Sequence, residues 1–368
     1  MSRVELKPGD RLVVKVGSAS LVGPDGALDS ERLASLCAGI AGARLNGIEA
    51  ILVSSGAIAA GLAPLGLVAR PSDMPSLQAA AAVGQGRLLA RYSAGLAEHG
   101  LLAAQMLLTR YDFMHRSHYL NARNTLDRLL ALGALPVVNE NDTVATDEIG
   151  FGDNDRLAAL VANLARARLL VLLTDAKGLH ASDPRHDPSA PLIDEVDRIT
   201  PELERRAGGR GTELGSGGMA SKLTAAWVAT FSGAAVVIAD ASEPQILDKV
   251  LAGGRLGTYF RPRPHRISAR RLWIAFAQPP RGTVVVDAGA HQALARHKRS
   301  LLAVGVTGVR GDFSPGDAVD VCDPEGNVFA RGLVRYEAAD LEEAAGRSTA
   351  GTSGGEVIHI DELVVLEE

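Results

Sequence analysis

The sequence predicts an α/β protein with an open, mainly parallel sheet sandwiched by helices. Through the first 260 residues, short aliphatic runs typical of strands buried on both faces alternate with longer segments of helical spacing. Aromatic residues make up only 4% of a chain rich in Ala, Leu, Val and Gly, which suits helices packed on a sheet. A length of 368 residues predicts two domains or three.

The composition, with 46% hydrophobic and 22% charged residues, is that of a globular protein. Cys37 and Cys322 lie far apart and outside any metal-binding spacing, which predicts a reducing compartment and no zinc site. No signal peptide or membrane span is visible, so we expect a cytoplasmic protein. The net charge of −5 is concentrated in the acidic segment after Arg281.

The first predicted strand covers residues 11–16 and is followed directly by Gly17 and Ser18. Lys15 interrupts its aliphatic run, and a buried lysine is costly unless its ammonium meets an anion. A lysine that extends to solvent from an edge strand is the alternative. The strand alone leaves both interpretations open.

The elements that follow alternate as a doubly wound sheet requires. Helical spacing covers residues 30–46, with Ser30 as the expected N-cap, and then residues 57–65, 76–98, 120–132, 154–166, 219–231 and 244–251. Further strands are predicted at residues 48–53, 101–108, 134–138, 169–173, 234–239 and 257–260.

Residues 139–155, NENDTVATDEIGFGDND, form the most informative segment. It contains six acidic residues, three asparagines and no basic residue, so its carboxylates repel one another unless a cation lies among them. A solvated surface loop is the simplest interpretation. The segment leaves the carboxyl end of a predicted strand, however, and open α/β sheets bind their ligands there.

Two other turns can hold an anion. Ser54-Ser55-Gly56 joins a strand to a helix, and the glycine-rich residues 208–222 lead into a helix with Lys222 in its first turn. Small residues at such turns let backbone N–H groups approach phosphate oxygens. A flexible solvent loop is the alternative for the second turn. The P-loop motif is absent, and His180, Asp183 and His186 are expected in a surface loop rather than at a metal.

Two lysines from distant segments, phosphate-binding turns and a loop rich in carboxylates and amides favour phosphoryl transfer. That reaction depends mainly on positioning and on neutralising the charge of the moving group. Carboxylates could hold Mg²⁺ or a substrate ammonium, and Asp155 at a helix N-terminus could orient the lysines. No grouping for covalent catalysis is visible.

The motifs that carry this chemistry also resemble those of the glutamate 5-kinases, a branch of the amino acid kinase family. They are VVKVGS at 13–18, SSGAIAAG at 54–61, AAQMLLTR at 103–110, LNARNTL at 120–126, PVVNENDTVAT at 136–146, FGDND at 151–155, LLTDAKGL at 172–179 and GSGGMASKLTAA at 215–226. The segment VTGVRGDFSPGDAVDVCDPEGNVFARGLVRY at 306–336 resembles the mainly-β PUA domain that many members carry.

The resemblance implies an amino acid kinase-like fold and ATP-dependent phosphorylation of the glutamate side chain, with Mg²⁺ accompanying ATP. It implies that Lys15 and Lys222 contact the transferred phosphoryl group and that Asp155 holds them. The glutamate ligands would be Ser55, Asp142, Asp153 and Asn154. The ATP site would comprise Lys15, Thr174, Asp175, Ser216, Gly217, Gly218, Met219, Ala220, Ser221 and Lys222. Ser216 stands where many members have Thr, and no protein ligand for the metal is assigned.

The resemblance further implies a homo-oligomer and feedback inhibition by proline. The expected organisation is a kinase domain at 1–260, an Arg/Pro-rich linker at 261–280 and a PUA-like domain at 281–368. PUA-like domains elsewhere bind RNA, but an acidic tail is poorly suited to phosphates, although residues 296–299 are locally basic. We therefore expect a structural or regulatory tail.

Two alternative functions remain at this point. Acetylglutamate, aspartate and uridylate kinases share the lysine and glycine pattern but lack the NENDTVAT segment and the PUA-like tail. An RNA-binding protein with a nucleotide-sensing domain is the other alternative, which would not require both lysines.

Overall fold

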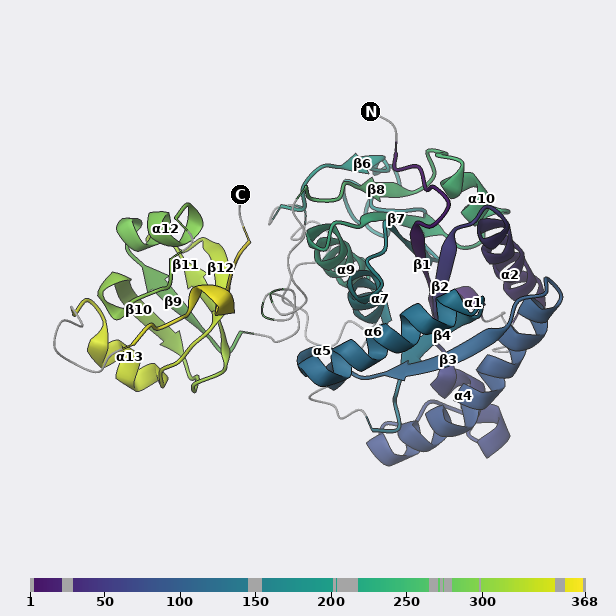
Figure 1. The fold of residues 1–368 in the computed structure, drawn as a ribbon, viewed down its shortest axis with the longest axis horizontal. Coiled ribbons are helices and arrows are strands. Elements are labelled where there is room, and N and C mark those ends of the chain that lie inside the picture. The colour runs from purple at the N-terminus through teal and green to yellow at the C-terminus, as the bar shows by residue number, and fades with distance from the viewer. Residues whose placement is uncertain are drawn as a thin grey trace. The chain divides into compact units, whose positions relative to one another are not determined.

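The computed structural model describes residues 3–21, 29–144, 154–200, 203, 218–264, 271, 274, 280–297, 299–347 and 355–366. The chain divides into two compact units, Met1–Arg266 and Ile267–Glu368. Each unit has its own sheet and its own apolar core (Figure 1). Within the described residues, no helix is long and apolar enough to cross a membrane.

The first unit contains an eight-stranded sheet in the order β3-β4-β2-β1-β5-β7-β8-β6. Neighbouring strands are parallel except for the antiparallel pair β7 and β8. The strands are β1 (Arg11–Val16), β2 (Glu49–Val53), β3 (Ala103–Leu108), β4 (Leu135–Glu140), β5 (Leu169–Thr174), β6 (Glu195–Val196), β7 (Ala235–Asp240) and β8 (Thr258–Phe260). The predicted fold class is confirmed, and β1 lies inside the sheet rather than at its edge.

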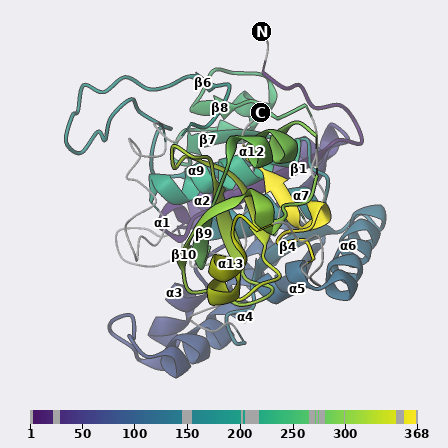
Figure 2. The same cartoon turned by 90° about the vertical axis from the view of Figure 1, so that its left-hand side faces the viewer.

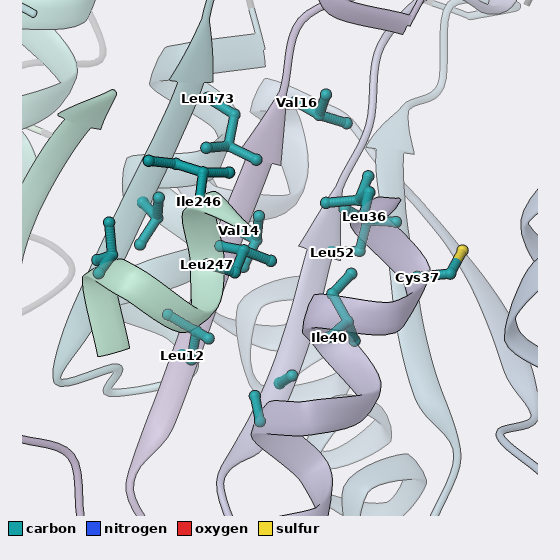
Figure 3. Close-up of a cluster of buried hydrophobic side chains, with 14 of the residues drawn as sticks. Leu12, Val14, Val16, Leu36, Cys37, Ile40, Leu52, Leu173, Ile246 and Leu247 are labelled. Carbon is teal, nitrogen blue, oxygen red and sulfur yellow. The ribbon is translucent and has the colours of Figure 1, made fainter. Parts of the chain in front are cut away.

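Helices cover the sheet on both faces. They are α1 (Ser18–Leu21), α2 (Ser30–Leu45), α3 (Ala57–Leu62), η1 (Ala63–Leu65), α4 (Met74–Ala97), α5 (Arg110–Met114), α6 (Arg116–Ala131), α7 (Asn154–Leu164), α9 (Met219–Phe231) and α10 (Ile246–Leu251). On one face α2 and α10 pack together over β1, with side chains such as Ile40 and Leu247 in the main apolar cluster (Figure 3). Helix α7 packs on β1 and α9 packs against α7.

The alternation of side chains along β1 explains how a lysine fits within a buried strand. Leu12, Val14 and Val16 belong to the apolar cluster beneath α2 and α10 (Figure 3). Successive side chains of a strand point to opposite faces, so Lys15 points to the other face. That face is covered by α7, whose first turn carries Asp155.

Helices α3 and α4 approach each other at two glycines. A Cβ atom on Gly61 would lie 1.9 Å from the carbonyl oxygen of Ala80, and one on Gly84 would lie 1.8 Å from that of Ala57. Any side chain at either position would therefore push the helices apart. The structure gives Gly84 a packing role.

The predicted long elements are found within a few residues of their expected bounds, with two kinds of difference. Ser30 is wrong as the N-cap of α2, because the side chain of Asp29 accepts the free N–H groups of Glu31 and Arg32. The short elements α1, α5 and β6 were not predicted. They contain four, five and two residues, too few to show a hydrophobic period.

The second unit contains a five-stranded sheet in the order β10-β9-β11-β12-β13. Its elements are β9 (Gly282–Val286), α12 (Ala288–Ala295), η2 (Ala303–Gly305), β10 (Val306–Gly311), β11 (Ala318–Cys322), β12 (Val328–Leu333), α13 (Ala338–Ala344), η3 (Ile360–Glu362) and β13 (Leu363–Val365). Helices α12 and α13 lie toward opposite ends of this unit in both views (Figures 1 and 2). The core includes Val284, Phe313, Val321 and Phe329.

Candidate functional site

The carboxyl ends of four adjacent parallel strands bring the predicted site residues to one edge of the sheet. Strands β4, β2, β1 and β5 are neighbours in that order. Lys15 near the end of β1 is in register with Val53 on one side and Leu172 on the other. Ligands of open α/β sheets bind at this edge, so the strand order alone concentrates the candidates there.

Three charged side chains meet where β1, α7 and α9 converge. The Lys15 ammonium lies 2.5 Å from one carboxylate oxygen of Asp155, and the Lys222 ammonium lies 3.2 Å from the other. The Asp155 side chain is fully buried, and the lysine side chains are 5% and 7% exposed. Ser221 also donates a hydrogen bond to this carboxylate, at 3.3 Å. One carboxylate thus holds both lysines.

The lysine cluster, defined as Lys15, Asp155 and Lys222, carries one more positive than negative charge. Water is almost excluded from these side chains, so their charges act much more strongly on a ligand than they would in bulk water. Asp155 lies in the first turn of α7, where the helix dipole favours a negative charge. The cluster is therefore arranged to attract an anion.

A group of amides lies beside the lysine cluster. Asn154 begins α7 and is 8% exposed. Its side-chain nitrogen donates to the backbone carbonyl of Ser54 and, over 2.6 Å, to the side-chain oxygen of Asn139. Ser54 directly follows β2 and Asn139 lies in β4. The first residue of α7 is therefore tied to the ends of two strands.

Ser55 and Asp142 lie in the loops that follow β2 and β4. The hydroxyl of Ser55 donates to the carbonyl of Val16 at 2.9 Å, which links two adjacent strand ends. Asp142 is half-buried, and burial raises the pKa of its carboxyl group above the ordinary value, although the charge of Arg70 acts in the opposite direction. A ligand cation would favour the ionised form of Asp142.

The predicted nucleotide residues that the structure describes lie around β5 and α9. Thr174 is buried at the end of β5 and donates to the side chain of Asp175 at 3.0 Å, whereas Asp175 itself is exposed. Gly218 is the N-cap of α9, and no atom of the described residues lies within 4 Å of where its Cβ atom would be. Met219 and Ala220 follow as half-buried residues of the first turn. Gly218, Met219 and Ala220 therefore form the start of α9.

Asp153, Ser216 and Gly217, which the sequence also predicts as site residues, lie outside the described residues. Conversely, sequence reasoning named Ser54 only as part of an anion-binding turn, and it gave no role to the Asn139 side chain or to the α4 side chains behind them. The Tyr92 hydroxyl, for example, lies 2.8 Å from the Ser54 hydroxyl. A seven-residue spacing places Tyr92 on the same face of α4 as Gln85, and two polar side chains on a core-facing stripe are the signal that could have indicated this support.

Comparison with known proteins agrees with this geometry. The model of the amino acid kinase family matches residues 10–240, and that of the PUA domain matches residues 282–352. The first match spans more than half of the sequence, and the chain belongs to the amino acid kinase family.

Within the family, curated relatives that the chain matches over nearly its full length include glutamate 5-kinases. Those of Citrifermentans bemidjiense and of Geobacter sp. strain M21 are each 48% identical, over 100% of this chain and 100% of their own. That of Thermobifida fusca is 48% identical over 99% of this chain and 95% of its own. The resemblance found in the sequence motifs is confirmed.

Proposed function

We propose that this protein transfers the terminal phosphoryl group of ATP to the side-chain carboxylate of L-glutamate. The product is L-glutamyl 5-phosphate, and the reaction is the first step of proline biosynthesis. The observation that carries the proposal is the lysine cluster beside Asn154, in a chain whose full-length relatives are glutamate 5-kinases.

The two lysines would stabilise the charge that the phosphoryl group carries as it moves. Preorganised cations in a site closed to water are an effective means of lowering such a barrier. The acceptor carboxylate is already ionised at neutral pH, so the reaction needs no general base. Asp155 would accordingly hold Lys15 and Lys222 at a fixed separation rather than remove a proton.

The amino acid would lie on the β4 side of the lysine cluster. Ser55, Asp142 and Asn154, together with Asp153, are the proposed glutamate ligands. Asp142 would face the substrate ammonium, which would offset the effect of burial on its carboxyl group.

ATP would lie on the β5 side, along Thr174, Asp175 and residues 216–222. Backbone N–H groups before α9 would face the phosphates. Within the described ranges no cluster of three His, Cys, Asp or Glu side chains is placed to hold a metal ion. In our proposal Mg²⁺ enters as the nucleotide complex, and no protein ligand is assigned to it.

The proposal extends to organisation and regulation. Residues 1–260 would form the kinase domain, 261–280 a linker and 281–368 the PUA-like domain of a cytoplasmic homo-oligomer. Proline would inhibit at a site that overlaps the glutamate pocket. A titration with proline should reduce activity by the millimolar range, and unchanged activity well beyond it would count against this regulation.

We propose a structural or regulatory role for the tail rather than RNA binding. Its acidic balance opposes phosphate contacts, although Arg296, His297 and Arg299 are exposed. The full chain should show no salt-sensitive RNA shift. A micromolar shift abolished by Lys298→Ala with Arg299→Ala would overturn this role.

The function is tested by measuring ATP consumption with Mg²⁺ and glutamate, aspartate, acetylglutamate or UMP in turn. Hydroxylamine in the assay traps an acyl phosphate as a hydroxamate. Hydroxamate formation with glutamate alone is the expected result. Turnover with another acceptor would reassign the substrate, and a folded protein silent with all four would favour a nucleotide-sensing protein.

A further inference from the structure

Two backbone groups determine which way the side-chain amides of the site face. The carbonyl of Ser54 can only accept a hydrogen bond, so the atom of Asn154 that meets it is the nitrogen. The N–H of Glu140 can only donate, and it lies 2.9 Å from the side-chain oxygen of Asn139. The orientations of both asparagine amides therefore follow from backbone chemistry.

Helix α4 supplies the next contact. With its oxygen held by Glu140 and Asn154, Asn139 turns its nitrogen toward α4 and donates to the side-chain oxygen of Gln85 at 2.6 Å. Gln85 follows Gly84, whose missing side chain lets α4 approach α3 closely. A half-buried glutamine, 54 residues away in sequence, thus ends a chain of three amides that begins at the site.

The chain of amides leaves one atom of Asn154 for a ligand. Its nitrogen already has two acceptors, one for each proton. Its oxygen has no donor among the residues that the structure describes. The group that Asn154 can offer a ligand is therefore a hydrogen-bond acceptor.

We propose that Gln85 is a positioning residue for the amino acid substrate. Through Asn139 it holds the side-chain oxygen of Asn154 toward the pocket, so this part of the site recognises an ammonium group rather than a carboxylate. The inference rests on the proposed function, since it concerns how the same pocket distinguishes glutamate. Gln85 itself touches neither substrate nor phosphate.

The physical reason is that the Asn139 nitrogen needs an acceptor. Without one on α4, that nitrogen would be left unsatisfied, and the Asn139 side chain would move toward another partner. A displaced Asn139 would hold Asn154 less firmly, because the Asn139 oxygen is one of the two acceptors of the Asn154 nitrogen. The Asn154 oxygen would then be less well fixed toward the substrate ammonium.

The test compares Gln85→Met, which removes the acceptor at similar size, with Gln85→Glu, which keeps it. Gln85→Met should raise the KM for glutamate about tenfold, the effect of one hydrogen bond to a charged group, with kcat and the KM for ATP nearly unchanged. Gln85→Glu should restore the KM to within about threefold of the wild type. Arg87→Met, an exposed change on the same helix, should match the wild type.

Glutarate, which is glutamate without its ammonium, separates recognition from general damage. Its inhibition constant against glutamate should stay the same in Gln85→Met. Equal losses for glutamate and glutarate, or no difference between Gln85→Met and Gln85→Glu, would overturn the inference while the wild type remains active. A wild type that forms no hydroxamate from glutamate would instead overturn the proposed function.

Discussion

Each unit of the protein buries an aspartate against basic side chains, but the balance of charge differs. In the second unit, Arg331 lies directly opposite Asp320 on β12 and β11, and two of its guanidinium nitrogens lie 2.7 Å from one carboxylate oxygen. The side chains are 9% and 14% exposed. This is one cation for one anion, across two paired strands.

In the first unit, one aspartate faces two lysines at the carboxyl edge of the sheet, where open α/β proteins generally bind their ligands. A matched pair inside a sheet satisfies its own charge, so its effect is on the folded structure. A carboxylate shared by two ammonium groups supplies one negative charge for two positive ones. The comparison indicates that the ratio of charges, rather than burial alone, distinguishes a site from a structural contact.

The largest effect should follow from breaking the lysine cluster. Lys222→Ala removes one preorganised cation, and we expect kcat for hydroxamate formation to fall by about 10²–10³. Thermal unfolding followed by circular dichroism should show an intact fold. Lys249→Ala is the control, because that lysine pairs with Glu243 on the outside of the same unit. A loss of about tenfold or less for Lys222→Ala would mean that its role is misassigned.

The second effect concerns the close packing of α3 and α4 behind the site and its contribution to the free energy of unfolding. Gly84→Ala places a methyl group against the α3 backbone and should lower the free energy of unfolding by about 3 kcal/mol. Gly86→Ala is the matched control on α4, since a Cβ atom there meets nothing within 4 Å. Chemical denaturation measures both variants. If Gly84→Ala and Gly86→Ala were equally stable, the close approach of α3 and α4 would not contribute to the free energy of unfolding.

The third effect should appear in the second unit without loss of catalysis. Asp320→Asn weakens the pair with Arg331, and unfolding of this unit should become easier by about 2 kcal/mol, typical of a hydrogen bond to a charged group. The KM and kcat for glutamate should not change. A large fall in kcat with normal stability would contradict the division between a structural pair and the proposed catalytic role of the lysine cluster.

The smallest effect concerns pH. Burial raises the pKa of Asp142, so this carboxyl takes up a proton at a higher pH than an ordinary aspartate. The substrate ammonium favours the ionised form, so glutamate affinity should rise with pH and level off above the pKa of the free enzyme. Calorimetric titrations across pH 4–7 should show this slope for the wild type and less of it for Asp142→Asn. Identical slopes for the two proteins would show that Asp142 is not a ligand of the substrate ammonium.

The sequence predicted the fold of the first unit well because its strands are continuous aliphatic runs at a regular pitch. It also named Lys15, Asp155 and Lys222 as candidate site residues, and their side chains meet although they lie on three elements that are distant along the chain. The motifs indicated that these three residues meet, but their spacing along the sequence could not. Their contact depends on α7 and α9 both beginning beside the carboxyl end of β1, which is a property of the folded chain.

The supporting amides could not be predicted in the same way. Gln85 lies within a helix of ordinary composition, and nothing local to it indicates that Asn139 is its partner. The cap of α2 was misplaced by one residue, because Asp29 and Ser30 are both good N-caps. The partner of Gln85 and the N-cap of α2 are determined by contacts in the folded chain, which the sequence pattern does not show.

The register of β1, the strand that carries Lys15, also determines when a refolding chain can become active. Since alternate residues of β1 face opposite sides, a pairing shifted by one residue would place the ammonium among Leu36 and Ile40 and a valine against Asp155. A refolding chain can therefore regain turnover only after β1 has found its register with β2 and β5. Recovery of enzyme activity during refolding would report the moment at which the centre of the sheet becomes native.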